Sequence, residues 1–136
     1  MRILLIGAGG VGNSLAKLLS TRSFYDSVVV ADYDLSRAES VLEWIAVRFP
    51  QARDKFTADR IDASSPAQVA ESAKRHCSTM VMNAVEPSFV ESIFEGARSA
   101  GADYMDMAMS LSKPHTEEPF TKPGVMLGEA QFAQAE

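Results

Sequence analysis

Short apolar runs alternate along the chain with longer segments in which apolar residues recur every three or four positions. The five runs occupy residues 3–6, 28–31, 56–61, 79–82 and 104–107, and the third predicts a weaker strand than the others. Runs of this length, apolar and rich in β-branched residues, predict strands that are buried on both faces of a sheet. The segments between them have the spacing of amphipathic helices, so the pattern predicts strand and helix in regular alternation.

Local signals mark several ends of the predicted helices. Asp34 precedes the second helical segment as a cap residue, and Pro50 ends that segment. Ser65 and Gln68 form a capping box around a proline at the start of the third helical segment. Gly101 ends the fourth. These residues limit the predicted helices independently of the apolar spacing.

The alternation predicts the fold class, which is α/β with a doubly wound parallel sheet covered by helices on both faces. We expect five strands in the order 3-2-1-4-5 within a domain over residues 1–110. The segment SLSKPHTEEPFTKPG then breaks the rhythm with three prolines and several charges. Over residues 111–136 we therefore expect a surface loop and the start of a helix, with the chain truncated before a sixth strand and a substrate domain.

Glycines are concentrated where the first predicted strand meets the first predicted helix. The sequence there is Gly7-Ala8-Gly9-Gly10-Val11-Gly12, which fits G-x-G-x-x-G. Asp32 follows 20 residues after Gly12, at the end of the second predicted strand. A strand before the glycines, an amphipathic helix after them and an acid at this distance together indicate a Rossmann-type dinucleotide-binding fold. In it, Gly7 permits the tight turn, Gly9 the approach of a pyrophosphate, and Gly12 close packing of the helix.

The carboxyl ends of the predicted strands supply further candidate contacts, because ligands of such sheets bind at this edge. Asp32 can accept hydrogen bonds from the hydroxyls of an adenosine ribose, and its alternative role is that of an acid at a helix entry. Tyr33 is either a neighbour of the adenine or a surface aromatic residue. The third and fourth strands end in Asp62-Ala63 and Asn83-Ala84, which we also expect near a cofactor.

The stretch NAVEPSFVESIFEGARSAGADYMDMA resembles part of the saccharopine dehydrogenase-like oxidoreductases, in which a strand ends in Asn-Ala, a proline begins a helix and Gly-Ala-x-Tyr-x-Asp follows. The matching residues are Asn83, Ala84, Pro87, Gly101, Ala102, Tyr104 and Asp106. The segments ADYDLSRAES and RIDASSP are also similar to that family's second and third strand ends. The resemblance implies the NAD(P)-binding domain of an oxidoreductase. It also implies a small amino-acid-like substrate, with hydride passing to or from an amine or imine carbon that joins two amino acids.

Cofactor choice depends on opposing signals at the end of the second predicted strand. Asp32 can bond the 2′-hydroxyl of NAD and would repel the 2′-phosphate of NADP, so we expect NAD. Arg37, one helical turn into the second helix, could contact such a phosphate, and Arg22 is a remoter candidate. The family that the chain resembles is often associated with NADP. NADP is therefore the alternative cofactor.

Two other functions share a glycine loop of this kind. A regulatory domain that senses NAD(H) or another nucleotide without catalysis also begins with a strand and a glycine loop. Adenylating enzymes of the ubiquitin-activating type contain Gly-Ala-Gly-Gly-Val-Gly, but the segment LSRAE after Asp32 lacks the Asn- and Arg-bearing sequence that they have there. The stretch around Asn83, Pro87 and Tyr104 favours the oxidoreductase over both.

Composition narrows the partners further. The net charge is −5 and no stretch collects Lys or Arg, which argues against nucleic acid or an anionic membrane as a partner. No apolar run is long enough for a signal peptide or a membrane span, so we expect a soluble, cytoplasmic protein. Cys77 is the only cysteine, and His76 and His115 lie far apart, so no metal site is expected. Glu86 is more typical of a helix-start cap than of a catalytic acid, and no catalytic residue is identified.

The last predicted strand lies next to the place where a sixth strand would pair. Its sequence over residues 102–107 contains no lysine or proline that would block pairing with another chain. We therefore expect a homo-oligomer formed through this edge or the apolar surface beside it. The methionines that alternate along the strand-like segments are expected to fill the core, and they are Met80, Met82, Met105, Met107 and Met109.

Overall fold

A computed structural model describes residues 1–107, 113–126 and 128–134 of the chain. Its strands are β1 (Arg2–Ile6), β2 (Ser27–Asp32), β3 (Phe56–Arg60), β4 (Met80–Asn83) and β5 (Asp103–Asp106). Its α-helices are α1 (Gly10–Leu19), α2 (Leu35–Arg48), α3 (Pro66–Arg75), α4 (Val90–Ala100) and α5 (Glu129–Phe132), with 3₁₀ helices η1 (Pro50–Lys55) and η2 (Pro87–Phe89). Each of the five predicted strands is present, with ends within one residue of the predicted range.

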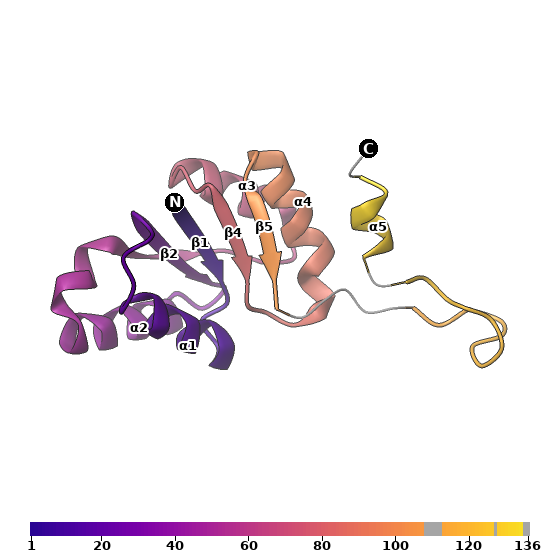
Figure 1. Cartoon of the computed structure of the whole chain (residues 1–136), viewed down its shortest axis with the longest axis horizontal. Coiled ribbons are helices and arrows are strands. Elements are labelled where there is room, and N and C mark those ends of the chain that lie inside the picture. Colours follow the sequence, from indigo (N-terminus) through magenta and orange to yellow (C-terminus); the bar gives the residue numbers. More distant parts are fainter. Residues whose placement is uncertain (108–112, 127, 135–136) are drawn as a thin grey trace.

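The five strands form one parallel sheet in the order β3-β2-β1-β4-β5, which confirms the predicted topology and its Rossmann-type class (Figure 1). Because β1 lies at the centre, the chain moves outward first to one edge and then, from β4, to the other. β1 and β4 are neighbours, and the loops that follow them therefore leave the carboxyl edge of the sheet in opposite directions. A crevice at this switch point is where sheets of this kind bind ligands.

Two apolar layers hold the helices on the sheet. On one face, Leu5 and Val30 pack with residues of α1 and α2 such as Ala16 and Ile45. On the other face, Leu4 and the neighbouring apolar strand residues pack with residues of α3 and α4. Strand residues alternate between these layers, and β1 is buried on both sides, as its continuous apolar run predicts.

The predicted helix caps are confirmed, with one difference. Asp34 caps α2 by accepting a hydrogen bond from the Ser36 amide at 3.0 Å, and Gly101 ends α4 in the left-handed conformation with φ 70°. Ser65 accepts from the Gln68 amide at 3.4 Å, but the reciprocal half of the capping box is absent. The Gln68 side chain instead accepts from the Asp62 amide at 3.0 Å, because the Ser65 amide already donates to the Asp62 carbonyl.

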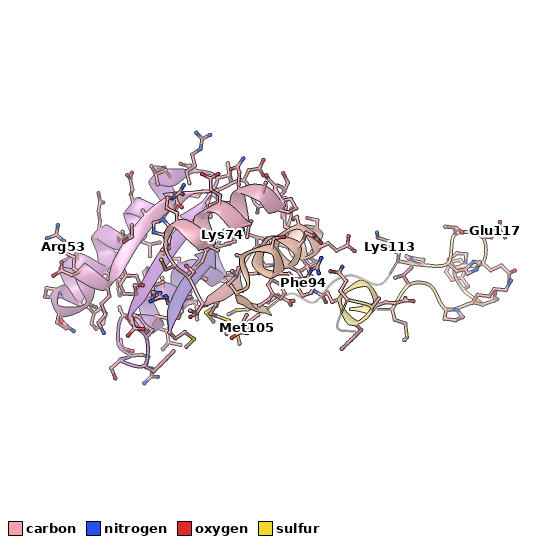
Figure 2. All side chains as sticks on the ribbon, turned by 90° about the horizontal axis from the view of Figure 1, so that it is seen from above. Arg53, Lys74, Phe94, Met105, Lys113 and Glu117 are labelled. Carbon is pink, nitrogen blue, oxygen red and sulfur yellow. The ribbon has the colours of Figure 1, made fainter. Side chains whose placement is uncertain are left out.

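The prediction that the methionines fill the core is wrong for two of them. Met80 and Met82 are partly buried against the α1/α2 layer, whereas Met105 is 46% and Met107 48% exposed. Met105 is paired with Met82 and faces the same side of the sheet, and no described helix covers β5 on that side (Figures 1 and 2). Met109 lies outside the described residues.

The residues after β5 contain two described pieces. Lys113 and Val125 form an isolated antiparallel bridge, and the short helix α5 follows. Figure 1 shows the described part of this tail extending away from the sheet. Its apolar side chains are exposed, Phe120 at 98% and Phe132 at 76%.

Candidate functional site

A cleft of about 400 Å³ opens at the carboxyl edge of the sheet, between the loops that follow β1, β2, β3 and β4. It is lined by residues from all four loops: Ile6, Gly7, Gly9, Asp32, Tyr33, Arg37, Ile61, Asp62, Ala63, Ala84, Val85, Glu86 and Phe89. Seven of the twelve predicted contact residues are in this lining, namely Gly7, Gly9, Asp32, Tyr33, Asp62, Ala63 and Ala84. Of the others, Ala8, Gly12 and Asn83 are buried, Gly10 begins α1, and Val11 of α1 is 53% exposed.

The floor of the cleft is a tight turn that depends on two glycines. Gly7 has φ 102°, a conformation that side chains disfavour, and its amide donates to the Ala31 carbonyl at 2.7 Å. A Cβ on Gly12 would lie 1.7 Å from the Gly7 carbonyl oxygen. The first turn of α1 therefore rests directly on the backbone of the turn, as the sequence predicts for these two positions.

Gly9 lies on the other side of the same loop and has a different environment. It is the N-cap of α1 with an ordinary extended backbone, and a Cβ built on it would meet no atom within 4 Å. No side chain caps this helix end, and its first turn holds no acidic residue. The amide groups at the start of α1 are donors that the helix itself does not use, and the helix dipole adds positive potential there. An anionic group can approach this backbone closely.

Asp32 ties the glycine loop to the next strand. The residue is 6% exposed, and its carboxylate accepts two backbone hydrogen bonds, from the Ala8 amide at 2.8 Å and from the Asp34 amide at 3.0 Å. Each oxygen keeps a further lone pair, since a carboxylate accepts at about four positions. Asp32 therefore fixes the loop and, as a lining residue, presents an acceptor to the cleft.

Tyr33 forms the outer rim beside Asp32 and is flanked by two arginines. Tyr33 is 65% exposed, and the Arg37 guanidinium lies 5.6 Å from the centroid of its ring. Arg60 donates to the Tyr33 carbonyl at 3.1 Å, and a neighbouring hollow is lined by Tyr33, Arg60, Asp62 and Gln68. Arg37 also lies 4.0 Å from the Asp34 carboxylate, so part of its charge is already balanced. This rim offers a flat aromatic face with charges of both signs.

Asp62 closes the cleft on the side of β3. Its carboxylate accepts from the Ser64 hydroxyl at 2.7 Å and from the Ser64 amide at 2.9 Å. These two hydrogen bonds lower the pKa of the Asp62 carboxyl below its ordinary value, so it is ionised at neutral pH. Ala63 follows with its carbonyl bound by the Ser92 hydroxyl of α4 at 2.6 Å.

The loop after β4 forms the wall opposite Asp32 and contains residues that the sequence does not single out. Val85 and Phe89 line the cleft, and a Cβ on Gly7 would lie 2.7 Å from the Val85 Cγ1 atom. Asn83 is fully buried and does not line the cleft, but its side-chain oxygen accepts from the Val85 amide at 2.9 Å. Val85 directly follows the Asn83-Ala84 pair, and this position is the feature of the sequence from which its place in the cleft could be predicted.

A second, partly buried carboxylate lies on the neighbouring strand and has different hydrogen-bond partners. Asp59 of β3 accepts hydrogen bonds from Ser72 and Arg75 of α3, both at 2.6 Å, and lies 3.3 Å from the His76 Nε2 atom. Burial raises the pKa of Asp59, but the hydrogen bonds from Ser72, Arg75 and the Arg60 amide outweigh it and hold the pKa below its ordinary value. None of these partners lines the cleft, and Arg60 lines the neighbouring hollow.

The described residues contain neither a metal-ion cluster nor a membrane-spanning helix. Over residues 1–107, 113–126 and 128–134, no three His, Cys, Asp or Glu side chains are grouped so that they could hold a metal ion. Within the same ranges, no helix has the length and apolar character required to cross a membrane.

Comparison with known families gives a match over nearly the whole chain. The family described as the saccharopine dehydrogenase NADP binding domain matches residues 3–136. The match continues past β5 through the tail.

Solved structures with a similar fold share little sequence with this chain. Saccharopine dehydrogenase (L-Glu forming) from Saccharomyces cerevisiae has a TM-score of 0.61 and 16% identity, over 77% of this chain and 21% of that protein. Quinate dehydrogenase from Corynebacterium glutamicum, in complex with NAD, has a TM-score of 0.51 and 21% identity, over 76% and 43%. The E. coli tRNA N6-threonylcarbamoyladenosine dehydratase TcdA, in complex with ATP, has a TM-score of 0.59 and 19% identity, over 83% and 54%. The chain thus spans about a fifth to a half of the length of these proteins, and the likeness concerns the fold.

Proposed function

Because the chain belongs to the family of saccharopine dehydrogenase NADP-binding domains, we propose that it binds a nicotinamide dinucleotide as the cofactor-binding portion of an oxidoreductase. The reaction that we propose for the whole enzyme is hydride transfer to or from the imine or amine carbon of an amino-acid-derived substrate. In this proposal the present chain binds the cofactor without turning over substrate alone.

One observation carries the proposal: the glycine loop leaves an uncapped helix end open beside a fixed carboxylate. A Cβ on Gly9 would touch nothing within 4 Å, while Asp32 is held at the neighbouring strand end by two backbone amides. The opening accepts a diphosphate against the first turn of α1, and the carboxylate accepts from ribose hydroxyls. A merely structural turn would have no need to keep this space free.

The remaining lining residues have roles that follow from their positions. Tyr33 offers its exposed ring to the adenine, and Asp62 supplies an ionised acceptor on the side of β3. Ala84 and Val85 would face the nicotinamide half, because they follow β4 on the far side of the glycine turn. The chemistry supplied by the bound nucleotide is hydride transfer at its nicotinamide ring.

For the choice of cofactor, we propose NAD over NADP. The support is electrostatic: Asp32 and the helix cap Asp34 place two carboxylates at the end of β2, and Arg37 is shared between Asp34 and the Tyr33 ring. A 2′-phosphate would meet both carboxylates. The name of the matching family favours NADP, so both nucleotides belong in the test.

Calorimetric titration of the chain with NADH, NADPH and ATP tests the proposal. We expect the tightest binding for NADH and the weakest for ATP. Binding of ATP without either reduced dinucleotide would overturn the proposal in favour of an adenylating enzyme. The regulatory alternative predicts the same NADH binding, but the complete enzyme would then show no cofactor oxidation with any amino-acid-derived imine.

We also propose that copies of the chain associate through β5. The support is that β5 ends the sheet and that Met105 and Met107 are about half exposed beside that edge. Light scattering tests this, with Met105→Lys expected to lower the apparent mass. A monomer at high concentration would contradict it. A cytoplasmic location, expected from the sequence, stays a prediction.

A further inference from the structure

A chain of partly buried hydrogen bonds joins the carboxyl ends of β4 and β5. The Val85 amide donates to the Asn83 side-chain oxygen at 2.9 Å, and the Asn83 side-chain nitrogen donates to the Tyr104 hydroxyl at 3.1 Å. The Tyr104 hydroxyl in turn donates to the Asp106 carboxylate. Since a backbone amide can only donate, the first bond fixes the orientation of the Asn83 side chain, and every later bond follows in the same direction.

The hydroxyl of Tyr104 has a role separate from that of its ring. The ring packs edge-on against Phe94 of α4 with 5.4 Å between centroids and joins the α3/α4 apolar layer. Phenylalanine could fill that role equally well. Burial, and then the neighbouring Asp106 carboxylate, raise the pKa of Tyr104 well above its ordinary value, although the bond from Asn83 lowers it. The hydroxyl therefore stays protonated and keeps donating at any physiological pH.

The far end of this chain of bonds reaches the floor of the cleft. Val85 and Ala84 pack against the glycine turn, where a Cβ on Gly7 would lie 2.7 Å from Val85 Cγ1 and 3.0 Å from the Ala84 carbonyl oxygen. A Cβ on Gly12 would lie 3.4 Å from the Ala84 Cβ atom. With so little free space, a shift of the loop after β4 would change the width of the cleft.

We propose that Tyr104 is a positioning residue of the dinucleotide cleft, acting through Asn83 on the Val85 wall. The inference rests on the proposed function for its ligand but not for its geometry. Without the hydroxyl, the Asn83 amide loses its fixed partner at full burial and no longer holds the Val85 amide in one place. The Val85 wall then moves away from Gly7, and the cleft binds the dinucleotide less tightly.

The test compares two Tyr→Phe variants that each remove a hydrogen-bonded phenolic hydroxyl. Tyr104→Phe breaks the chain of bonds, and Tyr25→Phe is the matched control, because the Tyr25 hydroxyl donates to the Leu19 carbonyl at 2.9 Å near the amino end of β2. We expect the Kd for NADH to rise about five- to tenfold in Tyr104→Phe and to stay unchanged in Tyr25→Phe, with similar losses of melting temperature. A merely structural role of Tyr104 would leave the two affinities equal, which would overturn the inference.

A second measurement needs no ligand. Hydrogen exchange of the Val85 amide in the free protein should become at least about tenfold faster in Tyr104→Phe and remain unchanged in Tyr25→Phe. Unchanged exchange overturns the inference whatever the cofactor does. If the unmodified chain binds no NADH, the proposed function fails, and faster Val85 exchange would still show that the hydroxyl holds the wall of the cleft.

Discussion

The two sides of the glycine loop differ in what they require from glycine. On the inner side, a Cβ on Gly7 would press on Val85 and a Cβ on Gly12 would lie 1.7 Å from the Gly7 carbonyl oxygen. On the outer side, a Cβ on Gly9 or Gly10 would meet no atom within 4 Å. The protein's own packing therefore explains the inner glycines and leaves the outer ones unexplained.

Within these six residues, the inner glycines are required by the fold, and the outer glycines indicate a function. Gly10 is the first residue of α1, where glycine is less favourable than alanine by up to about 1 kcal/mol and no neighbour prevents a side chain. A position that lowers helix stability without any steric reason inside the protein points to a requirement outside it. A group that must come close to the backbone, as a diphosphate does, is such a requirement.

The largest expected effect is at the inner side. Gly12→Ala places a methyl group 1.7 Å from the Gly7 carbonyl oxygen, far inside van der Waals contact distance, so α1 must move off the turn. We expect a loss of about 3 kcal/mol or more in the free energy of unfolding, together with loss of NADH binding. Urea unfolding measures the first and calorimetry the second.

Gly10→Ala is the matched control for this variant, because it adds the same methyl group in the same helix at an open position. Its stability should be equal to or slightly above that of the unmodified chain. If Gly12→Ala proved as stable as Gly10→Ala, the inner side of the loop would have no packing requirement and the comparison would fail.

The next effect is on the outer side and reverses the pattern. Gly9→Ala should fold with unchanged stability, since its backbone is in an ordinary extended conformation and the space around it is open. Its methyl group would stand where the diphosphate approaches, so we expect NADH to bind about 20- to 30-fold more weakly, roughly 2 kcal/mol. Calorimetry measures the change. Unaltered affinity in a folded Gly9→Ala protein would contradict the diphosphate site.

The sequence predicts the parts of this arrangement that depend on neighbouring residues. The strand order follows from regular alternation, and the Asp34 cap and the Gly101 helix end are local chemistry. The contact of Val85 with Gly7 is not predictable in this way, because it joins segments nearly 80 residues apart. The same holds for the Asn83–Tyr104 bond, which depends on the register between β4 and β5.

Two further differences have identifiable physical causes. Alternation along β5 correctly separates Tyr104 from Met105, but the sequence does not reveal that the described helices leave the Met105 side uncovered. For Asp32, the sequence predicts the place at the strand end and not its two bonds to backbone amides. Those bonds exist because the glycine loop turns back over β2, which is a property of the assembled sheet.

A third prediction extends the comparison from glycines to carboxylates. Asp59 is bound by side chains of α3, so it should serve the fold and not the cleft. We expect Asp59→Asn to lower the free energy of unfolding by about 1–2 kcal/mol at pH 7 and to leave NADH affinity unchanged. Asp103→Asn, at an exposed carboxylate of β5, is the control and should change neither quantity.

The effect of Asp59→Asn should depend on pH in a defined direction. The pKa of Asp59 is lower in the folded protein than in the unfolded chain, so its stabilisation is complete above the unfolded value of about 3.9. It is lost as the pH falls through the folded pKa, because the unfolded carboxyl group takes up its proton first. Urea unfolding should therefore give a smaller difference between the two proteins at pH 3 than at pH 7. An equal difference at both pH values would mean that the charge of Asp59 contributes nothing.

The smallest expected effect concerns cofactor choice at Asp32, which belongs to both sides of the comparison. Its carboxylate holds the Ala8 and Asp34 amides, and it also lines the cleft. Asp32→Ser removes the acceptor for a ribose hydroxyl and the charge that repels a 2′-phosphate. We expect the affinity for NADH to fall about fivefold, roughly 1 kcal/mol, and the affinity for NADPH to rise, so that the preference narrows or reverses.

Asp32→Asn separates the two causes, because it keeps one acceptor oxygen and removes the charge. If repulsion decides, NADPH should gain in Asp32→Asn nearly as much as in Asp32→Ser, while NADH loses less. If the hydrogen bonds decide, the two variants should differ mainly in NADH affinity.

Arg37 supplies the opposite perturbation, since its guanidinium is shared between the Tyr33 ring and Asp34 and could turn to a phosphate. Arg37→Ala should therefore weaken NADPH binding more than NADH binding. Tighter binding of NADPH than of NADH by the unmodified chain would show that Asp32 does not select the ribose, and the assignment of NAD would be wrong.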